Sequence, residues 1–494
     1  MSVPPARRLS GWTMIVRAGR EVGTLLFAGA TGLLLGGLST GLYVTMAGVV
    51  MSLLHNAVKW AAFSYTVYDD RIELRRALIG RSVTNIPIDR IRGVDISTTL
   101  PHRVLGVAVV HIDAAAAGEN TGEGTLNAVS RAEAVRLRQV LLSRSHARPD
   151  GAPAAVHPPR RGVLYARALP RWYLYAPLSG AYILTPFALA GSLLGALYNL
   201  GDDLGLLTER RLERLGQNAA GLPPLLAVGV VVLLVLAMPV ASVVAYALFN
   251  WDFTLRAVGG EGGDRDGTIV AERGLITRRS VSLEHARIRG VELRDNPLER
   301  LAGVVRLGAL VTGLGDSEHR RRLLPTSPRE VVTGVAGRVM SAPAGSLSVL
   351  ARLTGHPASA RRRRISRAVL PPLAVAPVAL VMGWPFVAYG AGALALLCLP
   401  LALDRYRQLG HADDGTRLTM RSGSLRRHQV IIEHRAVLGW ELRQSLFQRR
   451  SGLVTLVAGV GAGRGGYPVI DLAEEDAVAL ARDITPQWVT PFLE

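Results

Sequence analysis

Cysteine is almost missing from this 494-residue chain, and its single copy, Cys398, lies inside an apolar run. One cysteine allows neither an intrachain disulfide nor a cysteine-based metal site. The scarcity of cysteine agrees with domains that lie in a reducing compartment, where disulfides do not persist.

Lysine is nearly absent as well, because Lys59 is the only one, and arginine supplies almost all of the positive charge. The net charge is +19 at pH 7. A basic balance suits either nucleic acid or an anionic lipid surface. Since the chain also has long apolar runs, the arginine bias of cytoplasmic loops in membrane proteins is the first explanation. We expect membrane lipids, with anionic headgroups as candidates, and no nucleic acid.

The sequence lacks a recognisable catalytic or metal-binding constellation. It has no Walker loop and no His-Glu-x-x-His helix. His428 and His434 have no second ligand cluster, whereas a zinc site needs several converging ligands. The stretch 461–466 has the glycine spacing of a dinucleotide loop, but a strand pattern follows where a helix is required. We expect no enzymatic activity, no catalytic residue, no cofactor and no metal.

Long apolar runs are present, and they predict six membrane-spanning helices in three pairs. A span needs about 20 apolar residues, and the runs at 22–63, 173–249 and 368–403 each have room for two. Within the second run, the loop 199–221 has charges that nearly cancel.

Three segments between and after these runs, 64–145, 250–341 and 404–494, are soluble in character. Each has short runs rich in β-branched residues, separated by turn signals, and then a helical pattern. Several antiparallel strands closed by one C-terminal helix are therefore expected in each. A Pro- and Arg-rich linker, 146–172, and an Arg-rich linker, 342–367, precede the second and third helix pairs.

The expected topology follows from the even number of spans between soluble segments. All three segments and the N-terminal residues 1–21 should lie on one side, and the arginine bias marks that side as cytoplasmic. The loop 199–221 should then be external. We expect a multi-pass protein of a bacterial cytoplasmic membrane.

A short motif recurs in the three soluble segments. Arg-Ile-Arg-Gly-Val occupies 90–94 and 287–291, and a diverged copy lies at 435–439. A second glycine follows the first at thirteen positions each time, with an arginine three residues before it. The motif residues are Arg90, Arg92, Gly93, Arg103, Gly106, Arg287, Arg289, Gly290, Arg300, Gly303, Arg435, Gly439, Arg449 and Gly452.

Two interpretations of this motif are open. Its arginines could face an anionic headgroup. Alternatively, its glycines mark bulges or close approaches of the backbone, and its arginines pair with acids such as Asp89, Asp95 and Asp113. The structural interpretation is favoured, because the glycine spacing persists in the third copy while the polar residues drift.

Separate basic clusters lie beside two of the apolar runs. Setting the membrane topology is sufficient to explain them, and lipid binding would be a consequence, at about 1 kcal/mol for each basic residue near an anionic leaflet. The candidate contacts with anionic lipid are Arg160, Arg161, Arg167, Arg171, Arg361, Arg362, Arg363, Arg364 and Arg367.

The chain resembles the YdbS/YdbT-like bacterial membrane proteins, which carry bacterial pleckstrin-homology (PH) domains. The resemblance rests on residues 86–95 with 103–106, and on 281–291 with 300–303. It implies three PH-like domains, each a small seven-stranded β-barrel or sandwich capped by a C-terminal helix. The resemblance implies no settled activity.

Together these features predict a multi-pass α-helical membrane protein with three cytosolic PH-like domains. We expect a non-enzymatic scaffold or binding module at the membrane surface, whose partner is a protein, a second copy of the chain or anionic lipid. The alternative is a transporter-like, channel-like or envelope-stress membrane component. The spans contain essentially no ionisable residue, which argues against transport.

Overall fold

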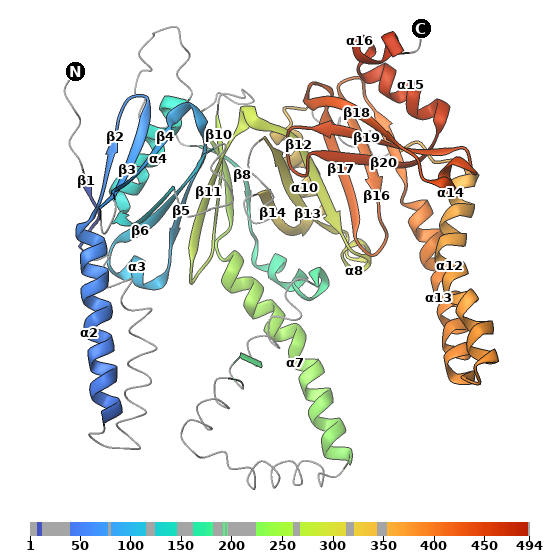
Figure 1. The fold of residues 1–494 in the computed structure, drawn as a ribbon, viewed down its shortest axis with the longest axis horizontal. Coiled ribbons are helices and arrows are strands. Elements are labelled where there is room, and N and C mark those ends of the chain that lie inside the picture. The colour runs from blue at the N-terminus through green and yellow to red at the C-terminus, as the bar shows by residue number, and fades with distance from the viewer. Residues whose placement is uncertain are drawn as a thin grey trace. The chain divides into compact units, whose positions relative to one another are not determined.

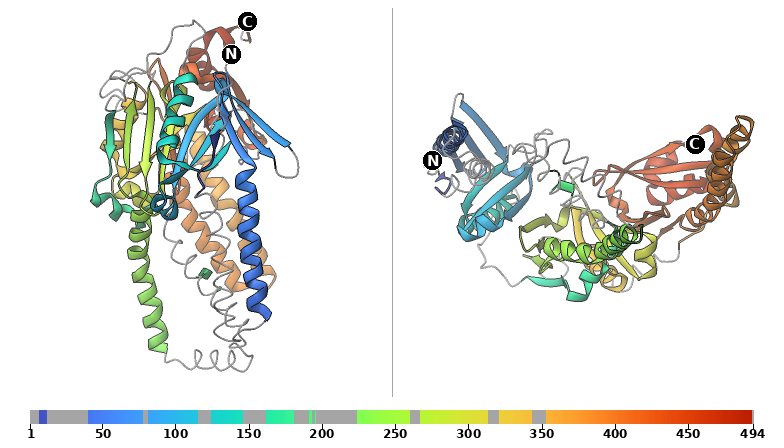
Figure 2. Two further views of the ribbon diagram at one scale, coloured as in Figure 1. Left: turned by 90° about the vertical axis from the view of Figure 1, so that its left-hand side faces the viewer. Right: turned by 90° about the horizontal axis from the view of Figure 1, so that it is seen from below.

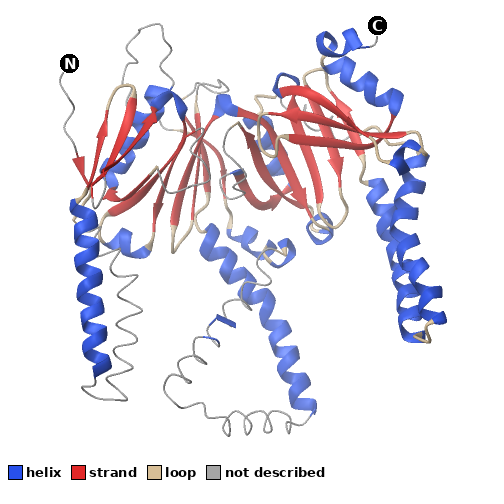
Figure 3. Ribbon diagram, viewed as in Figure 1, coloured by secondary structure: helices blue, strands red, loops and turns tan. Residues whose placement is uncertain are grey.

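The computed structural model describes residues 7–11, 40–77, 81–114, 124–145, 162–180, 191, 192, 195, 224–259, 267–312, 321–342 and 353–492. The chain forms two compact units. The first unit comprises Met1–Gly259 and Thr268–Leu283, and the second comprises Gly260–Gly267 and Glu284–Glu494. Antiparallel strands dominate both units, and in each unit the apolar helices extend away from the ends of the strands (Figure 3).

One series of elements occurs three times along the chain, and we call each series a repeat (Figure 1). Three strands, a 3-10 turn and a fourth strand are followed by a short helix, two further strands and a longer helix. Repeat 1 comprises β2 (Phe63–Val67), β3 (Arg71–Ala77), β4 (Arg81–Pro87), η1 (Ile88–Arg90), β5 (Ile91–Thr98), α3 (Leu100–Val104), β6 (Val107–Ala114), β7 (Thr125–Ser130) and α4 (Arg131–Ser145).

The later repeats keep this order. Repeat 2 comprises β9 (Thr254–Val258), β10 (Thr268–Arg273), β11 (Arg278–Glu284), η4 (His285–Arg287), β12 (Ile288–Asp295), α8 (Pro297–Leu301), β13 (Val304–Val311), β14 (Arg322–Pro328) and α10 (Arg329–Val339). Repeat 3 comprises β15 (Gly410–Asp413), β16 (Arg417–Ser422), β17 (Arg427–Glu433), η5 (His434–Ala436), β18 (Val437–Arg443), α14 (Leu446–Arg449), β19 (Leu453–Val460), β20 (Gly466–Ala473) and α15 (Glu474–Ile484). Two short helices, α16 (Pro486–Val489) and η6 (Thr490–Phe492), follow it.

Each repeat also receives a short extended segment from the chain before its apolar helices. The strand β1 (Arg7–Arg8) pairs with β2, and β8 (Val163–Arg167) pairs with β9. A single bridge between Thr354 and His411 takes this place at β15. The three repeats therefore share more of their structure than the motif alone predicts.

The core of repeat 1 forms because alternate residues of its strands are apolar and face the C-terminal helix. Ile72, Leu74 and Val110 are buried on the strands, and Leu137 and Leu141 of α4 pack against them. A matching core in repeat 3 joins β-strand residues to the apolar face of α15. Side chains of this size gain roughly 1.5–3 kcal/mol each on full burial.

The sheets do not stop at the repeat boundaries. The first unit has a four-stranded sheet, β1-β2-β3-β4, and a seven-stranded sheet, β7-β6-β5-β11-β10-β9-β8. The second unit has a six-stranded sheet, β14-β13-β12-β17-β16-β15, and a three-stranded sheet, β18-β19-β20. The expectation of three self-contained barrels or sandwiches is therefore wrong, because β5 and β12 each pair with a strand of the following repeat.

The prediction of six membrane-spanning helices in three pairs is also wrong. Within the described residues, two helices are long and apolar enough to cross a membrane, α12 (Ala358–Val381) and α13 (Pro385–Arg407). They pack side by side after a turn at Gly383, whose φ of 74° lies in the left-handed region (Figure 1).

Two further helices, α2 and α7, are not among those long and apolar enough to cross a membrane in the described residues. The helix α2 (Thr40–Ala61) is continuous, but His55, Asn56 and Lys59 interrupt its apolar sequence near its end. The helix α7 (Pro224–Asn250) carries no charged residue, and the apolar helix found within it among the described residues is Val235–Asn250. Both leave the sheets of the first unit on the same side (Figure 2).

The predicted third span does not begin as a regular helix. Two 3-10 helices, η2 (Pro170–Tyr175) and η3 (Pro177–Ser179), occupy its start. Pro177 lacks a backbone N–H and Gly180 has a φ of 65°, so the chain turns there. The predicted span over 22–39 and the loop 199–221 lie outside the described residues.

Candidate functional site

The first glycine of the motif lies where two repeats share a sheet. We call the pairing of β5 with β11 the first seam, and the pairing of β12 with β17 the second seam. A Cβ atom on Gly93 would lie 3.3 Å from the carbonyl oxygen of Ser282. A Cβ atom on Gly290 would lie closer than 3.0 Å to the carbonyl oxygen of Ile431. Glycine is needed because the backbone of the following repeat approaches at this point.

The two seams have the same register. Thr98 is opposite Arg278 in the first seam, and Asp295 is opposite Arg427 in the second. These residues occupy matching positions. Thr98 and Asp295 follow the first motif glycine of their repeats at the same distance, and Arg278 and Arg427 are the first residues of β11 and β17. Consecutive repeats are therefore joined in the same way at both seams.

The second glycine of the motif ends the short helix of each repeat. Gly106, Gly303 and Gly452 have φ values of 66°, 66° and 60°, a region that glycine enters without steric cost. In each repeat this conformation turns the chain from the short helix into the next strand.

The arginine three residues before this glycine contacts the backbone of the following repeat at each seam. The guanidinium of Arg103 donates to the carbonyl oxygen of Leu275 at 2.7 Å, in the turn between β10 and β11. The guanidinium of Arg300 donates to the carbonyl oxygen of Ser424 at 2.8 Å, in the matching turn between β16 and β17. In repeat 3, Arg449 is exposed, and no hydrogen bond or ion pair of its side chain occurs among the described residues.

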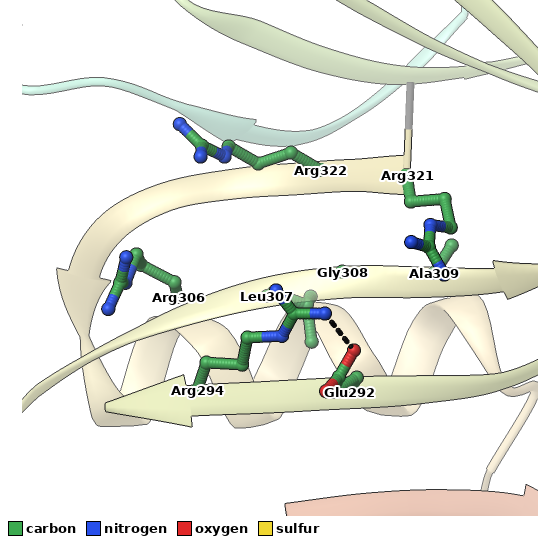
Figure 4. Close-up of a pocket in the computed structure, with 8 residues that line it drawn as sticks. All are labelled: Glu292, Arg294, Arg306, Leu307, Gly308, Ala309, Arg321 and Arg322. Atoms are coloured by element: carbon green, nitrogen blue, oxygen red, sulfur yellow. Dashed lines mark hydrogen bonds and ion pairs between the residues drawn. The ribbon is translucent and has the colours of Figure 1, made fainter. Parts of the chain in front are cut away.

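The second seam also carries charged contacts. Arg427 donates from Nε to Asp295 at 2.9 Å. The carboxylate of Glu292 accepts from Arg294 at 2.7 Å and lies 2.9 Å from Nδ1 of His428. Figure 4 shows the guanidinium of Arg294 reaching along β12 to Glu292, beside a cavity of about 30 Å³. Burial opposes the charged form of Glu292, but the hydrogen bonds from His428 and Arg294 outweigh it and lower its pKa to about 2.

This shift predicts acid sensitivity of the second seam. A depressed pKa contributes stability above the ordinary value of 4.5, and the contribution is lost as the pH falls towards 2. The full shift corresponds to roughly 3 kcal/mol. We expect Glu292→Gln to lower the melting temperature in detergent at pH 7, and the gap from the parent protein to shrink below pH 4.5.

Asp483→Asn is the control for this measurement, because the Asp483 side chain is 65% exposed and 3.9 Å from Arg482. Its gap from the parent protein should be small and should not change with pH in the same window. A Glu292→Gln gap that is constant from pH 7 to pH 2 would contradict the assignment.

The remaining motif arginines lie at the opposite end of the strands from the short helices. Arg287 pairs with Glu284, and Arg435 pairs with Glu433 at 2.6 Å. Arg90 is exposed and Arg289 is half-buried. The side chain of Arg92 lies outside the described residues.

The short helices, and the turns before β11 and β17, present apolar side chains to solvent. We call the following residues the apolar rim, with the first four in the first unit and the rest in the second: Leu100, Val104, Leu275, Ile276, Leu298, Leu301, Leu425, Leu446 and Phe447. The most exposed are Leu301 at 87% and Val104 at 85%. Clustered exposure of large apolar residues is unusual on a soluble surface and marks a contact with membrane or protein.

In each unit, contacts place this rim at the ends of apolar helices. The backbone N–H of Leu275 donates to the carbonyl oxygen of Leu248 near the end of α7, at 2.9 Å. Arg300 lies 3.6 Å from Asp404 near the end of α13. The short helix α14 reaches the start of α12 through Asp471, which accepts from Gln448 at 2.9 Å and from Arg363 at 2.6 Å.

A hollow of about 780 Å³ opens beside the first seam. Apolar side chains of α3 and of the turn before β11 line it together with Arg103, Arg131 and Arg138. Arg138 also donates to Oγ of Ser280 on β11 at 2.9 Å. Glu272 also lines the hollow and pairs with Arg278 at 3.3 Å, so apolar side chains, several cations and one carboxylate meet there.

The predicted lipid-contact arginines divide into distinct groups. Arg363 and Arg364 are occupied internally, because both donate to the fully buried carboxylate of Asp471. Arg167 lies 3.1 Å from Asp252, with both side chains exposed. The side chains of Arg171, Arg361, Arg362 and Arg367 are also exposed, whereas Arg160 and Arg161 lie outside the described residues.

No group of three or more His, Cys, Asp or Glu side chains able to hold a metal ion occurs in the described part of the chain. His356 and His411 lie together, with ring centroids 5.4 Å apart. Burial, together with the neighbouring His356, lowers the pKa of His411 to about 4. This pair packs between the start of α12 and the sheet, and Tyr406 donates to the carbonyl oxygen of His356 at 2.8 Å.

The family model for the bacterial PH domain matches the chain three times, over residues 22–145, 208–330 and 368–487. The chain therefore belongs to the bacterial PH domain family, and each match takes in apolar residues before a repeat as well as the repeat itself. The family explains why the same series of elements recurs.

Among proteins of known name, the chain is similar to the UPF0699 transmembrane protein YdbT of Bacillus subtilis (strain 168). The two are 21% identical over 445 residues, which cover 86% of this chain and 85% of the relative. No solved structure matches. The transmembrane relative and the two apolar helices α12 and α13 are consistent with a membrane protein.

Proposed function

We propose that this protein is a non-enzymatic scaffold whose PH repeats rest on the cytosolic face of a bacterial membrane and contact anionic lipid there. In this proposal α12 and α13 cross the bilayer and hold repeat 3 at the surface. The apolar rim enters the headgroup region, and exposed arginines beside it bind phosphate groups.

The observation that carries the proposal is the position of the apolar rim at the ends of the apolar helices. Leu301 and Leu446 would be costly in water, but they gain by burial at the boundary between headgroups and acyl chains. Arg361, Arg362 and Arg367 are exposed at the start of α12, where a cytosolic anionic leaflet attracts cations. The excess of arginine beside this helix supports the cytosolic orientation.

The lipid contact can be tested with the full-length protein in nanodiscs of mixed neutral and anionic phospholipid. Replacing Arg361, Arg362 and Arg367 with glutamine should reduce the anionic lipid retained by the protein, measured by mass spectrometry. The loss should reach about fivefold for each arginine, because each contributes about 1 kcal/mol at an anionic surface. High salt should weaken the retention by the parent protein, since exposed charges are screened.

A matched control replaces three exposed arginines away from the start of α12, namely Arg435, Arg464 and Arg482. Equal losses in both triple variants, or no preference for anionic lipid in the parent protein, would overturn the lipid contact. For orientation, a cysteine introduced at exposed Asp483 in a Cys398→Ala background should react with an impermeant reagent only after cells are permeabilised. Reaction in intact cells would overturn the cytosolic placement.

A further inference from the structure

The seams use two particular sheet edges of each repeat. At every seam the fourth strand of one repeat, β5 or β12, pairs with the third strand of the next, β11 or β17. Two such edges remain after both seams are made. They belong to β18 in repeat 3 and to β4 in repeat 1, which end their sheets in the described part of the chain.

The outer edge of β18 has the features that the two seams use. A Cβ atom on Gly439 would meet nothing within 4 Å, so the place that a carbonyl oxygen fills beside Gly93 and Gly290 is open. The short helix after β18 carries Arg449, whose counterparts Arg103 and Arg300 donate to the next repeat. Among the described residues this guanidinium has no acceptor.

Both edges expose apolar side chains. On β18, Leu438 and Leu442 are 68% and 55% exposed, and on β4 Val83 is 49% exposed. A bulge often protects a strand edge, but the register shift at Val437/Gly439 of β18 has a counterpart at Ile288/Gly290 of β12, and β12 still pairs at the second seam. When the register of the seams is applied to these two strands, Leu442 comes opposite Val83, and Gly439 comes opposite Ile86. That register joins the exposed apolar residues of the two strands as a cross-strand pair.

We propose that the protein assembles head to tail, with β18 of one copy adding to β4 of the next in the register of the internal seams. The occupant of each free edge is a second copy of this chain, because the chain itself twice fills the same edge with the same element. The contact joins two different surfaces, so it generates a ring if it closes and a polymer if it does not. The assembly goes beyond the proposed lipid contact and does not depend on it.

Cross-linking in full-length protein tests this assembly. In a Cys398→Ala background, Val83→Cys and Leu442→Cys together should give a ladder of dimers, trimers and larger products with a short bismaleimide. Directly opposite Cβ atoms of paired strands lie about 4.5–5.5 Å apart, within reach of such a reagent. Thr84→Cys with Leu442→Cys is the control, since a one-residue slip moves one thiol to the other face.

The single variants distinguish the other arrangements. Efficient dimers from Leu442→Cys alone would mean that β18 pairs with itself, and would overturn the proposal. A folded double variant that stays monomeric at all concentrations would overturn it as well. The experiment is run in neutral detergent, so failure of the lipid contact cannot remove the ladder, and failure of the ladder leaves the lipid contact standing.

A second measurement needs no cross-linker. Gly439→Val should raise the concentration at which half of the protein is assembled by at least about tenfold, which corresponds to roughly 1.4 kcal/mol of overpacking at the edge. Mass photometry of the detergent-solubilised protein reports this change. The variant should keep the circular dichroism of the parent protein, because Gly439 has open space around it within the chain. An unchanged assembly midpoint would contradict the proposed register.

Discussion

Replacing Gly290 with alanine should lower the melting temperature of the protein in detergent by roughly 6–12 °C, while the same change at Gly439 should leave it nearly unchanged. A Cβ atom on Gly290 would overlap the carbonyl oxygen of Ile431 and press on side-chain carbons of Ile432 and Leu310, both at 3.1 Å. The carbonyl belongs to the partner strand of the second seam, so relief requires β12 and β17 to separate. Overpacking of this kind costs roughly 3 kcal/mol, and about 2–4 °C accompanies each kcal/mol in a unit of this size.

Three matched substitutions make this prediction quantitative. Gly93→Ala should fall between the other two, because its Cβ atom would lie at 3.3 Å from Ser282 and a small shift can accommodate it. Hydrogen exchange should show that Gly290→Ala loosens the amides of β12 and β17 before those of β19 and β20. Equal melting temperatures for the Gly290 and Gly439 variants would contradict the role given to the motif glycine.

Replacing Asp471 with asparagine should release the apolar helix pair from repeat 3 and lower the melting temperature by about 10 °C. The Asp471 carboxylate is fully buried and accepts from Arg363, Arg364 and Gln448. Asparagine keeps the shape and tolerates the φ of 63° at this position, so the change removes mainly the negative charge. Two arginines that are 12% and 11% exposed then lose their counter-ion, and breaking a buried pair in this way costs roughly 3–5 kcal/mol.

Limited proteolysis and a melt measured together check this prediction. Cleavage should increase at the start of α12, where His356 also reaches the backbone carbonyl of Asp471 at 3.1 Å. Glu441→Gln serves as a control, because its partner Arg443 is exposed and surface pairs contribute about 0–1 kcal/mol. An Asp471→Asn protein as stable as the Glu441→Gln protein would show that Arg363 and Arg364 hold the helices without their carboxylate.

The repeat could be predicted from the sequence, but its joints could not. The spacing of Gly93 and Gly106 recurs in all three copies, and the structure gives matching elements to each. The alternation of apolar residues also indicates antiparallel strands. It does not show that β5 pairs with β11, because strand pairing across a domain boundary depends on tertiary contacts that no local pattern encodes.

The candidate lipid contacts show a second limit. Arg361, Arg362, Arg363 and Arg364 are adjacent and chemically identical, yet only the last two face Asp471. A helical rotation of about 100° per residue separates their directions, but the buried acceptor lies more than a hundred positions away. The exposed rim residues were not predicted either, although every short helix has an apolar residue within three positions of its arginine.

The seams make the repeats modular. Every repeat offers one edge as a donor and one as an acceptor, and the matching register makes these edges interchangeable in principle. A chain with one repeat deleted could therefore rejoin its neighbours, and a chain with one repeat added could extend without a new interface. Repeat number can then change by duplication alone, and it sets how many short helices with exposed apolar residues one polypeptide carries.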